Sequence, residues 1–292
     1  MNEDIDVVIP WLNPTDKWFS QYKKYCENEN PCRIRDLNTI RPTIKSILKN
    51  LPWIRYIWLI VFDEEQYSNL DWEELKNEKI KFVHHRDIIP QEFLPNFNSI
   101  ITEAFIHNID GIADYFIFSD DDMIYNRYVP KEHYIFNKKP VHKKKSLYNH
   151  KDISFCMYSY IINSTSNFIK IITGNKMMCD NFHMPSLHET SLLKFLWYKY
   201  ENYIIETFKD SKIRKKKNIS MIMTMYTLEE IYNICVYEKT QIKTSPIWLN
   251  DGTKKEDLIK LKNENDIVCL NDSEELSDKY SKIIADYIKD LF

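Results

Sequence analysis

Three consecutive aspartates, Asp120, Asp121 and Asp122, are the residues of this chain with the clearest potential for chemistry. They follow the apolar run 115–118, which is typical of a buried strand. Two unit charges about 4 Å apart repel by roughly 4 kcal/mol at an effective dielectric of about 20, so the cluster is either spread into water or holds a cation. Ligands of open α/β sheets bind beyond the carboxyl ends of the strands, and Mg²⁺ takes carboxylate oxygens together with substrate phosphates. The cluster therefore indicates either a metal–phosphate site or an acidic, solvated turn, and these residues alone do not separate the two.

Asp272 repeats this arrangement near the end of the chain. It follows the apolar run 267–270 closely, as Asp122 follows 115–118. If the later strand joins the same sheet, both carboxylates can reach one crevice.

Arg33, Arg35 and Arg41 lie close together near the start of a predicted helix. Guanidinium groups match phosphate oxygens, so these arginines are candidates for binding a diphosphate. Ordinary pairing with Asp36 is the alternative, and spacing alone favours it slightly.

Glu103 and His183 are candidates for proton transfer. Glu103 borders the apolar stripe of a predicted helix, although a local pair with His107 at i+4 is the favoured alternative. His183 precedes Met184 and Pro185 in a predicted loop, where a histidine can act as a general acid or base or bind a metal. Most single loop histidines do neither.

Arg214 opens the basic run 214–217. A solvated basic face is the simplest interpretation. The sharper ones are a phosphate clamp at Arg214, or lysines that hold an anionic acceptor or a membrane surface.

The first 125 residues alternate strands with helices, which predicts a largely parallel sheet with helices on both faces. The second half is less regular, and we predict helices at 187–208 and 219–237 and a loop at 244–252. No period is visible over 146–180. A strand at 267–270 precedes a final amphipathic helix from Ser273, whose apolar stripe could be core, a dimer face or a membrane contact. Core is the commonest use of such a stripe. The predicted strands of the first half are 5–9, 57–62, 80–83 and 115–118, and its helices are 18–26, 42–51, 71–76 and 100–108.

Composition narrows the function further. The 292 residues suffice for one large domain or two small ones, and the net charge of −3 does not suggest a nucleic-acid binder. Only three glycines are present, so no glycine-rich phosphate loop can form, and side-chain cations with a metal would have to neutralise any phosphate. The six cysteines contain no CxxC pair, and acidic residues at positions 3, 4 and 6 are not typical of a signal peptide. We expect reduced thiols and a cytoplasmic protein.

Four blocks of sequence together resemble the Stealth family of sugar-phosphate transferases. That family includes bacterial capsule-polymerising hexose-1-phosphate transferases and the animal enzyme that adds GlcNAc-1-phosphate to lysosomal glycans. The second block is long and specific, whereas the third and fourth are short. The first block is IDVVIPW at 5–11 with Asp16 and Trp18. The second runs from RIRD at 33–36 through LPNFNS at 94–99 and Glu103 to 116–123. The third is FHMP at 182–185 plus Arg214, and the fourth is CLND at 269–272.

The resemblance implies an α/β, GT-A-like fold in a single catalytic domain. It would consist of a nucleotide-sugar-binding half at 1–137, a helical acceptor-binding insertion at 138–264, and a returning strand and helix at 265–292. The implied catalytic set is Glu103, Asp122, His183, Arg214 and Asp272. Asp122 and Asp272 would hold Mg²⁺ or Mn²⁺. Residues that would face the donor are Asp6, Arg33, Arg35, Arg41, Asn98 and Asp121.

The implied reaction moves a sugar-1-phosphate from a nucleotide-diphosphate sugar, with a UDP-sugar as first choice, to a saccharide hydroxyl. The acceptor could be lipid-linked, and the enzyme could touch the inner face of the membrane. A metal-dependent GT-A glycosyltransferase that releases a nucleoside diphosphate is the alternative. A third reading is a carbohydrate- or lipid-binding module without catalysis.

Overall fold

A five-stranded sheet forms the centre of the protein, and its strand order is β10-β4-β1-β2-β3. The computed structural model describes residues 3–26, 34–144, 146–179, 184–237 and 241–292. Strands β4, β1, β2 and β3 run parallel, whereas β10 is antiparallel to β4 at one edge. The predicted largely parallel sheet is therefore confirmed. The strands are β1 (Ile5–Pro10), β2 (Ile57–Val61), β3 (Ile80–His84), β4 (Tyr115–Phe118) and β10 (Ser186–Glu189).

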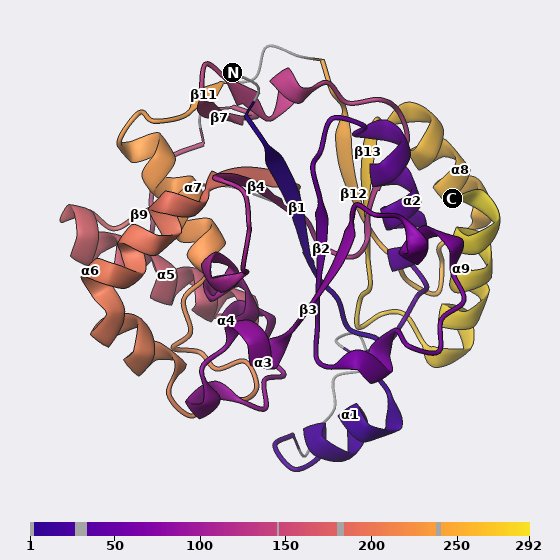
Figure 1. Cartoon of the computed structure of the whole chain (residues 1–292), viewed down its shortest axis with the longest axis horizontal. Coiled ribbons are helices and arrows are strands. Elements are labelled where there is room, and N and C mark those ends of the chain that lie inside the picture. Colours follow the sequence, from indigo (N-terminus) through magenta and orange to yellow (C-terminus); the bar gives the residue numbers. More distant parts are fainter. Residues whose placement is uncertain (1–2, 27–33, 145, 180–183, 238–240) are drawn as a thin grey trace.

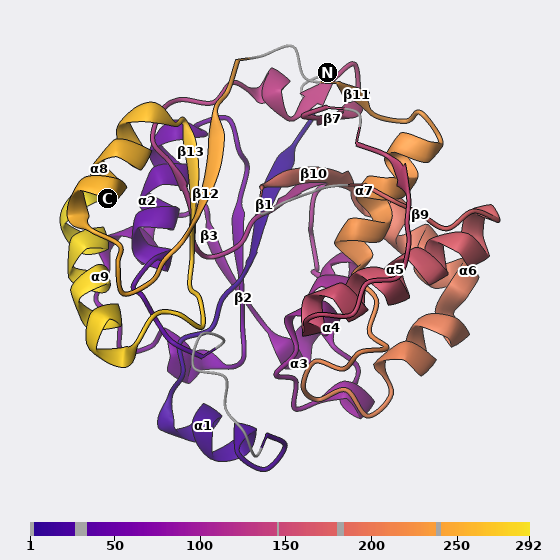
Figure 2. The same cartoon turned by 180° about the vertical axis from the view of Figure 1, so that it is seen from behind.

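Helices cover both faces of this sheet, as predicted for an α/β fold (Figures 1 and 2). Helices α4 to α7 lie on one side, and their apolar residues form a core with Val8, Ile60 and Phe116 of the sheet. Helix α2 lies on the other side and packs on Ile9, Leu59 and neighbouring strand residues. The helices are α2 (Ile40–Asn50), α4 (Ser99–Ala104), α5 (Met157–Thr173), α6 (Thr190–Phe208) and α7 (Met221–Ile231).

The last strand, β13 (Ile267–Asn271), does not join the central sheet. It lies in a second sheet of order β12-β13-β5, parallel to β12 (Thr244–Trp248) and antiparallel to β5 (Met123–Tyr125). Because β5 follows the three aspartates directly, this pairing still brings the end of β13 to them. Helices α8 (Lys255–Glu264) and α9 (Asp278–Leu291) cover this second sheet.

Helix α9 uses its apolar stripe as core. Ile284 and Ile288, together with Leu276 just before the helix, are buried against Val268 and Leu270 of β13. The helix begins at Asp278 with Ser277 as its N-cap, later than the predicted start at Ser273. The interpretation of this stripe as core is therefore confirmed.

Two sequence predictions in the second half were wrong, and one helix was missed. The predicted helix at 187–208 begins as strand β10, because Leu187 packs in the core while Ser186 and His188 bind each other. The predicted loop at 244–252 contains β12, where Pro246 is tolerated because the strand lies at a sheet edge. Helix α5 was missed because its buried face includes Ser159, Thr165 and Ser166, which blur the apolar period.

Smaller elements complete the described chain. Helix α1 (Asp16–Tyr22) follows β1 near the carboxyl edge of the sheet, and α3 (His85–Ile88) follows β3. A three-stranded sheet has the order β11-β7-β6, and β8 pairs with β9. These strands are β6 (Ile135–Phe136), β7 (Lys139–His142), β8 (Tyr148–Asn149), β9 (Met177–Met178) and β11 (Val236–Tyr237).

Candidate active site

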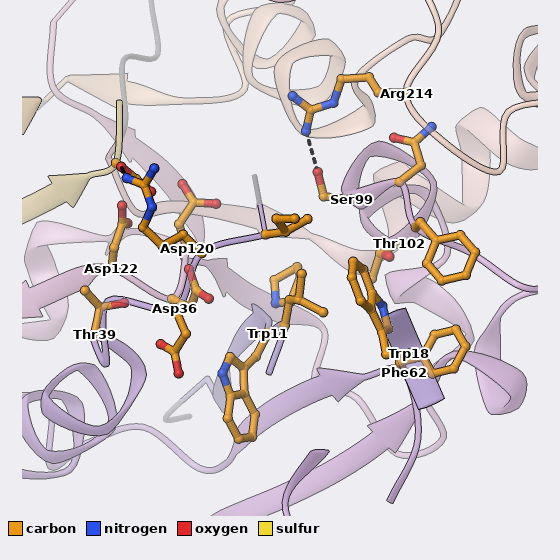
Figure 3. Close-up of a pocket in the computed structure, with 18 of the residues that line it drawn as sticks. Trp11, Trp18, Asp36, Thr39, Phe62, Ser99, Thr102, Asp120, Asp122 and Arg214 are labelled. Atoms are coloured by element: carbon orange, nitrogen blue, oxygen red, sulfur yellow. Dashed lines mark hydrogen bonds and ion pairs between the residues drawn. The ribbon is translucent and has the colours of Figure 1, made fainter. Parts of the chain in front are cut away.

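A cavity of about 490 Å³ lies at the carboxyl edge of the parallel strands (Figure 3). Its wall includes Trp11 after β1, Phe62 after β2, His85 after β3 and Asp120 after β4. This is the position at which open α/β sheets bind ligands. The second sheet closes one side of the cavity through residues 270–272.

Asp120 and Asp122 lie on one side of the cavity with Asp36 beside them (Figure 3), and Asp121 also lines the cavity. Burial, reinforced by the charge of Asp120, raises the pKa of Asp122 to about 7. Burial together with Asp122 and Asp120 also raises the pKa of Asp121 well above its usual range. The three aspartates lie at a turn and are partly buried in the cavity wall, so the metal–phosphate interpretation stays a prediction.

Asp122 is fixed against the returning strand. Its backbone carbonyl accepts a hydrogen bond from the Leu270 amide at 3.1 Å, and Cys269 Sγ lies 3.3 Å from its Oδ1. Asp122 and Asp272 therefore share one cavity, although β5 and β13 belong to the second sheet.

Arg35 binds Asp272 rather than its neighbour Asp36. Arg35 Nη1 donates to Asp272 Oδ1 at 2.8 Å, and both side chains are 11% exposed. A weaker contact joins Arg35 to Asp278 at 3.5 Å. Burial raises the pKa of Asp272 to about 6, although Arg35 opposes this rise. The expected pairing of Arg35 with Asp36 is replaced by this ion pair.

Glu103 is buried in the cavity wall, and its carboxylate accepts a hydrogen bond from Ser220 Oγ at 3.0 Å. The expected pair with His107 does not form: burial lowers the pKa of His107 to about 4, and its Nδ1 has no hydrogen-bond partner in the described chain. Burial raises the pKa of Glu103 to about 7, with Arg214 opposing and Asp120 adding to the rise. A carboxylate whose pKa lies near neutrality is suited to general acid–base catalysis.

Arg214 lies across the cavity from the aspartates, and its Nη2 donates to Ser99 Oγ at 2.6 Å (Figure 3). The three lysines that follow it are exposed. Asn98 also lines the cavity, but its side chain is engaged in the scaffold. It caps α4 through the Ile100 amide and donates to Asn218 Oδ1 at 2.9 Å.

Aromatic side chains, for which the sequence predicted no role, form another part of the wall. Trp18 stacks on Tyr22 with ring centroids 4.8 Å apart, and Phe62 stacks on Phe97 at 5.6 Å. Trp18 also meets Phe97 edge-on at 5.5 Å. The sequence signal was present, since Trp18 and Phe97 lie within the first and second family blocks. Such rings can stack on a base or a sugar face.

Two predicted donor-binding residues lie outside this cavity. Asp6 is fully buried at the amino end of β1, where Arg55 holds both its oxygens at 2.9 and 2.6 Å and Trp58 Nε1 donates at 2.8 Å. Arg41 pairs with Glu74 at 3.1 Å. Both side chains are engaged in these contacts away from the cavity. The structure therefore contradicts their assignment to donor binding and gives them structural roles.

Arg33 and His183 lie outside the described residues. Their predicted contacts with the donor phosphates and the reacting hydroxyl stay predictions.

The acid side of the cavity fits a divalent cation in its donor chemistry. No three His, Cys, Asp or Glu side chains within the described chain form a group that could hold a metal by themselves. Mg²⁺ is commonly held by one or two carboxylates together with substrate phosphates, and Mn²⁺ also prefers oxygen ligands. Asp272 Oδ2 is buried without a hydrogen-bond partner in the same residues, so one carboxylate oxygen remains for a ligand.

Fold and cavity thus define an α/β protein with an acid-and-arginine site at the carboxyl edge of a parallel sheet. Residues 33–144 match the family model described as Stealth protein CR2, conserved region 2. The chain therefore carries this region of the Stealth proteins, and the resemblance seen in the sequence is confirmed. The match covers the second block, while the first, third and fourth blocks stay predictions.

Relatives include a capsular polysaccharide phosphotransferase of Actinobacillus suis, 30% identical over 236 residues, which cover 74% of this chain and 61% of the relative. An exopolysaccharide phosphotransferase of Lactiplantibacillus plantarum is 26% identical over 213 residues, which cover 68% of this chain and 61% of the relative. The chain therefore spans about three-fifths of the length of these relatives.

Among solved structures, a galactosyltransferase in complex with donor and acceptor sugar analogues is similar to this protein. The match covers 98% of this chain and 96% of the galactosyltransferase chain. The TM-score is 0.43 and the sequence identity 11%. A TM-score below 0.5 does not by itself establish a shared fold.

Proposed function

We propose that this protein transfers a sugar-1-phosphate from a nucleotide-diphosphate sugar to a hydroxyl of a saccharide acceptor. One observation carries the proposal: a single cavity combines a cluster of aspartates, two arginines and a carboxylate with a near-neutral pKa. These are the groups that phosphoryl transfer requires, namely charge neutralisation on the phosphate oxygens and a proton acceptor. The relatives named as polysaccharide phosphotransferases support the same reaction.

In this mechanism the acceptor hydroxyl attacks the phosphorus that is bonded to the donor sugar. A new oxygen–phosphorus bond forms, the bond to the bridging oxygen of the diphosphate breaks, and a nucleoside monophosphate leaves. Glu103 accepts the hydroxyl proton, unless His183 does so. Arg214 faces the developing charge on the transferred oxygens.

Asp122 and Asp272 would hold Mg²⁺ or Mn²⁺, which would supply further neutralisation of the diphosphate when bound. Arg35 keeps Asp272 in place through their ion pair. The aromatic side chains provide a stacking surface for the nucleobase or for a sugar ring, and a UDP-sugar is the donor we would test first.

The protein would act in capsule or other cell-surface polysaccharide synthesis, on an oligosaccharide or polysaccharide acceptor that could be lipid-linked. Within the described part of the chain, no helix has the length and apolar character needed to cross a membrane. We propose a cytoplasmic site of action, with the exposed lysines after Arg214 as a contact to anionic groups at the membrane surface.

The leaving nucleotide tests this proposal. The protein is incubated with UDP-, GDP- and CMP-sugars, a mixed oligosaccharide acceptor and Mg²⁺, and the released nucleotide is identified. We expect a monophosphate from the wild type and from the control Arg41→Ala, which lies outside the cavity, and none from Asp122→Asn.

Release of a nucleoside diphosphate would instead identify a conventional glycosyltransferase. Tight binding of a nucleotide sugar without turnover on any acceptor would identify a binding module. Persistent monophosphate release by Asp122→Asn would remove the assigned role of Asp122.

A further inference from the structure

Ser220 connects the start of helix α7 to the carboxylate of Glu103. We infer that Ser220 is a positioning residue that holds Glu103 Oε2 and directs the exchangeable proton of this acid to Oε1, on the cavity side. The inference rests on the proposed function, in which Glu103 accepts a proton from the acceptor hydroxyl.

The hydrogen bonds of Ser220 determine where its single hydroxyl proton lies. Ser220 is the N-cap of α7, and its Oγ accepts from the Met223 amide at 3.2 Å. The same Oγ lies 3.0 Å from Glu103 Oε2. Because the amide can only donate, the serine proton is the one shared with Oε2.

Oε2 is therefore an acceptor in both protonation states of Glu103. A proton taken up by the acid must reside on Oε1, which has no hydrogen bond within the described part of the chain. Glu103 lines the cavity, so Oε1 is the oxygen left to meet a substrate hydroxyl. A carboxylate held at one oxygen and open at the other has the geometry of a general base.

The backbone of Ser220 is also held from two helices. Its amide donates to Thr165 Oγ1 of α5 at 3.0 Å, and its carbonyl accepts from Thr224 Oγ1 at 2.7 Å. Ser220, Thr165 and Thr224 are all buried. The serine hydroxyl is therefore a fixed donor rather than a rotating one.

The other charges near Glu103 lie on separate segments. Arg214 favours its ionised form and Asp120 opposes it. Tyr158, on α5, is close enough that Glu103, after burial, contributes to raising the pKa of its hydroxyl. Removing the Ser220 hydroxyl leaves these groups in place and takes away one donor that stabilises the carboxylate, so the pKa of Glu103 should rise.

Ser220→Gly tests the inference without removing the helix cap, since glycine is nearly as good an N-cap as serine. The titration of Glu103 is followed by carboxyl ¹³C NMR on glutamate-labelled protein, with the Glu103→Gln variant used to assign the signal. We expect its midpoint to move upward by about one pH unit in Ser220→Gly, which is the effect of losing one hydrogen bond to a charged group. Ser220→Thr should restore the wild-type midpoint.

Ser277→Gly is the matched control, because Ser277 caps α9 in the same way but has no acid on its hydroxyl. Its Glu103 titration should match the wild type. An unchanged midpoint in Ser220→Gly would overturn the inference, whatever the enzyme does.

The activity profile distinguishes this result from failure of the proposed function. The acid limb of kcat against pH should move upward with the NMR midpoint, while the KM for the donor stays constant. If the NMR midpoint moves but no donor is turned over by the wild type, the positioning role stands and the proposed function fails.

Discussion

Replacing Asp122 by Asn should make the metal-free protein more stable at alkaline pH, although it removes a residue we assign to the active site. Asparagine is nearly isosteric with aspartate and carries no charge. The ionised carboxylate of Asp122 is partly buried beside Asp120, and burial of an uncompensated charge is costly. Natural active sites often retain such a cost because function requires the charge.

The structure bounds the size of this effect. The folded pKa of Asp122 is about 7, against an ordinary value of 3.8, a difference of about 3 pH units. At 1.36 kcal/mol per pH unit, the ionised group would destabilise the folded state by at most about 4 kcal/mol. Because Asp120 and Asp121 share the charge of the cluster, we expect about 1–3 kcal/mol.

The pH dependence has a definite sign. Between about pH 4 and 7 the folded state retains a proton on Asp122 that the unfolded state has lost, so the free energy of unfolding falls as pH rises. The stability of the protein with a protonated Asp122 is fully present below about pH 4 and is lost as the pH passes through about 7. The stability gain of Asp122→Asn should therefore be near zero at about pH 4 and largest above about pH 8.

Urea unfolding in EDTA at these two pH values measures the effect, and Asp266→Asn is the control. Asp266 lies just before β13, where the Lys243 amide and Arg127 lower its pKa despite partial burial. Its replacement should therefore destabilise the protein at alkaline pH. Added Mg²⁺ should stabilise the wild type and not Asp122→Asn. If Asp122→Asn proves less stable than the wild type at about pH 8 in EDTA, our account of the buried acid is refuted.

Three further predictions follow from the positions of single side chains. Glu103→Gln should lower kcat by about 10²–10⁴-fold with little change in the KM for the donor, since a positioned base contributes about that much. A rise in KM as large as the fall in kcat, measured by steady-state kinetics, would argue for a binding role. Arg214→Lys should lower kcat by roughly 10²-fold while Arg41→Lys does not, because Arg214 lines the cavity and Arg41 does not; equal effects on kcat would refute the assignment. Asp6→Asn should lower the free energy of unfolding by about 3–5 kcal/mol, since it leaves Arg55 without its bidentate partner, while activity per folded molecule is retained; urea unfolding and activity at low temperature check both parts.

Much of the first half of the chain could be predicted from local pattern. The strands at β1, β2, β3 and β4 are apolar runs that alternate with helical periods, so the parallel sheet followed from spacing alone. The second half could not be predicted in this way. There the buried faces of the helices carry hydroxyl side chains, and β12 contains a proline that is acceptable only at a sheet edge.

The sequence also did not predict which residues pair with each other at the site. Local spacing favoured pairing of Glu103 with His107 and of Arg35 with Asp36. The structure instead pairs Glu103 with Ser220 and Arg35 with Asp272, more than a hundred residues away in each case. Spacing along a helix reports only neighbours within about four residues, so contacts between distant elements need the tertiary fold.

The sequence by itself determined the chemical inventory of this protein: carboxylates at two strand ends, arginines for phosphate and a set of elements that must form a parallel sheet. It could do so because residue types and apolar periods are local properties. The tertiary structure alone decided which of these residues share a cavity, since β13 returns beside β5 in a second sheet and places Asp272 near Asp122. It also excluded Asp6 and Arg41 from the cavity. The tertiary structure raised the pKa of Glu103 and of Asp122 as well, because desolvation and the approach of distant charges are not encoded in a linear pattern.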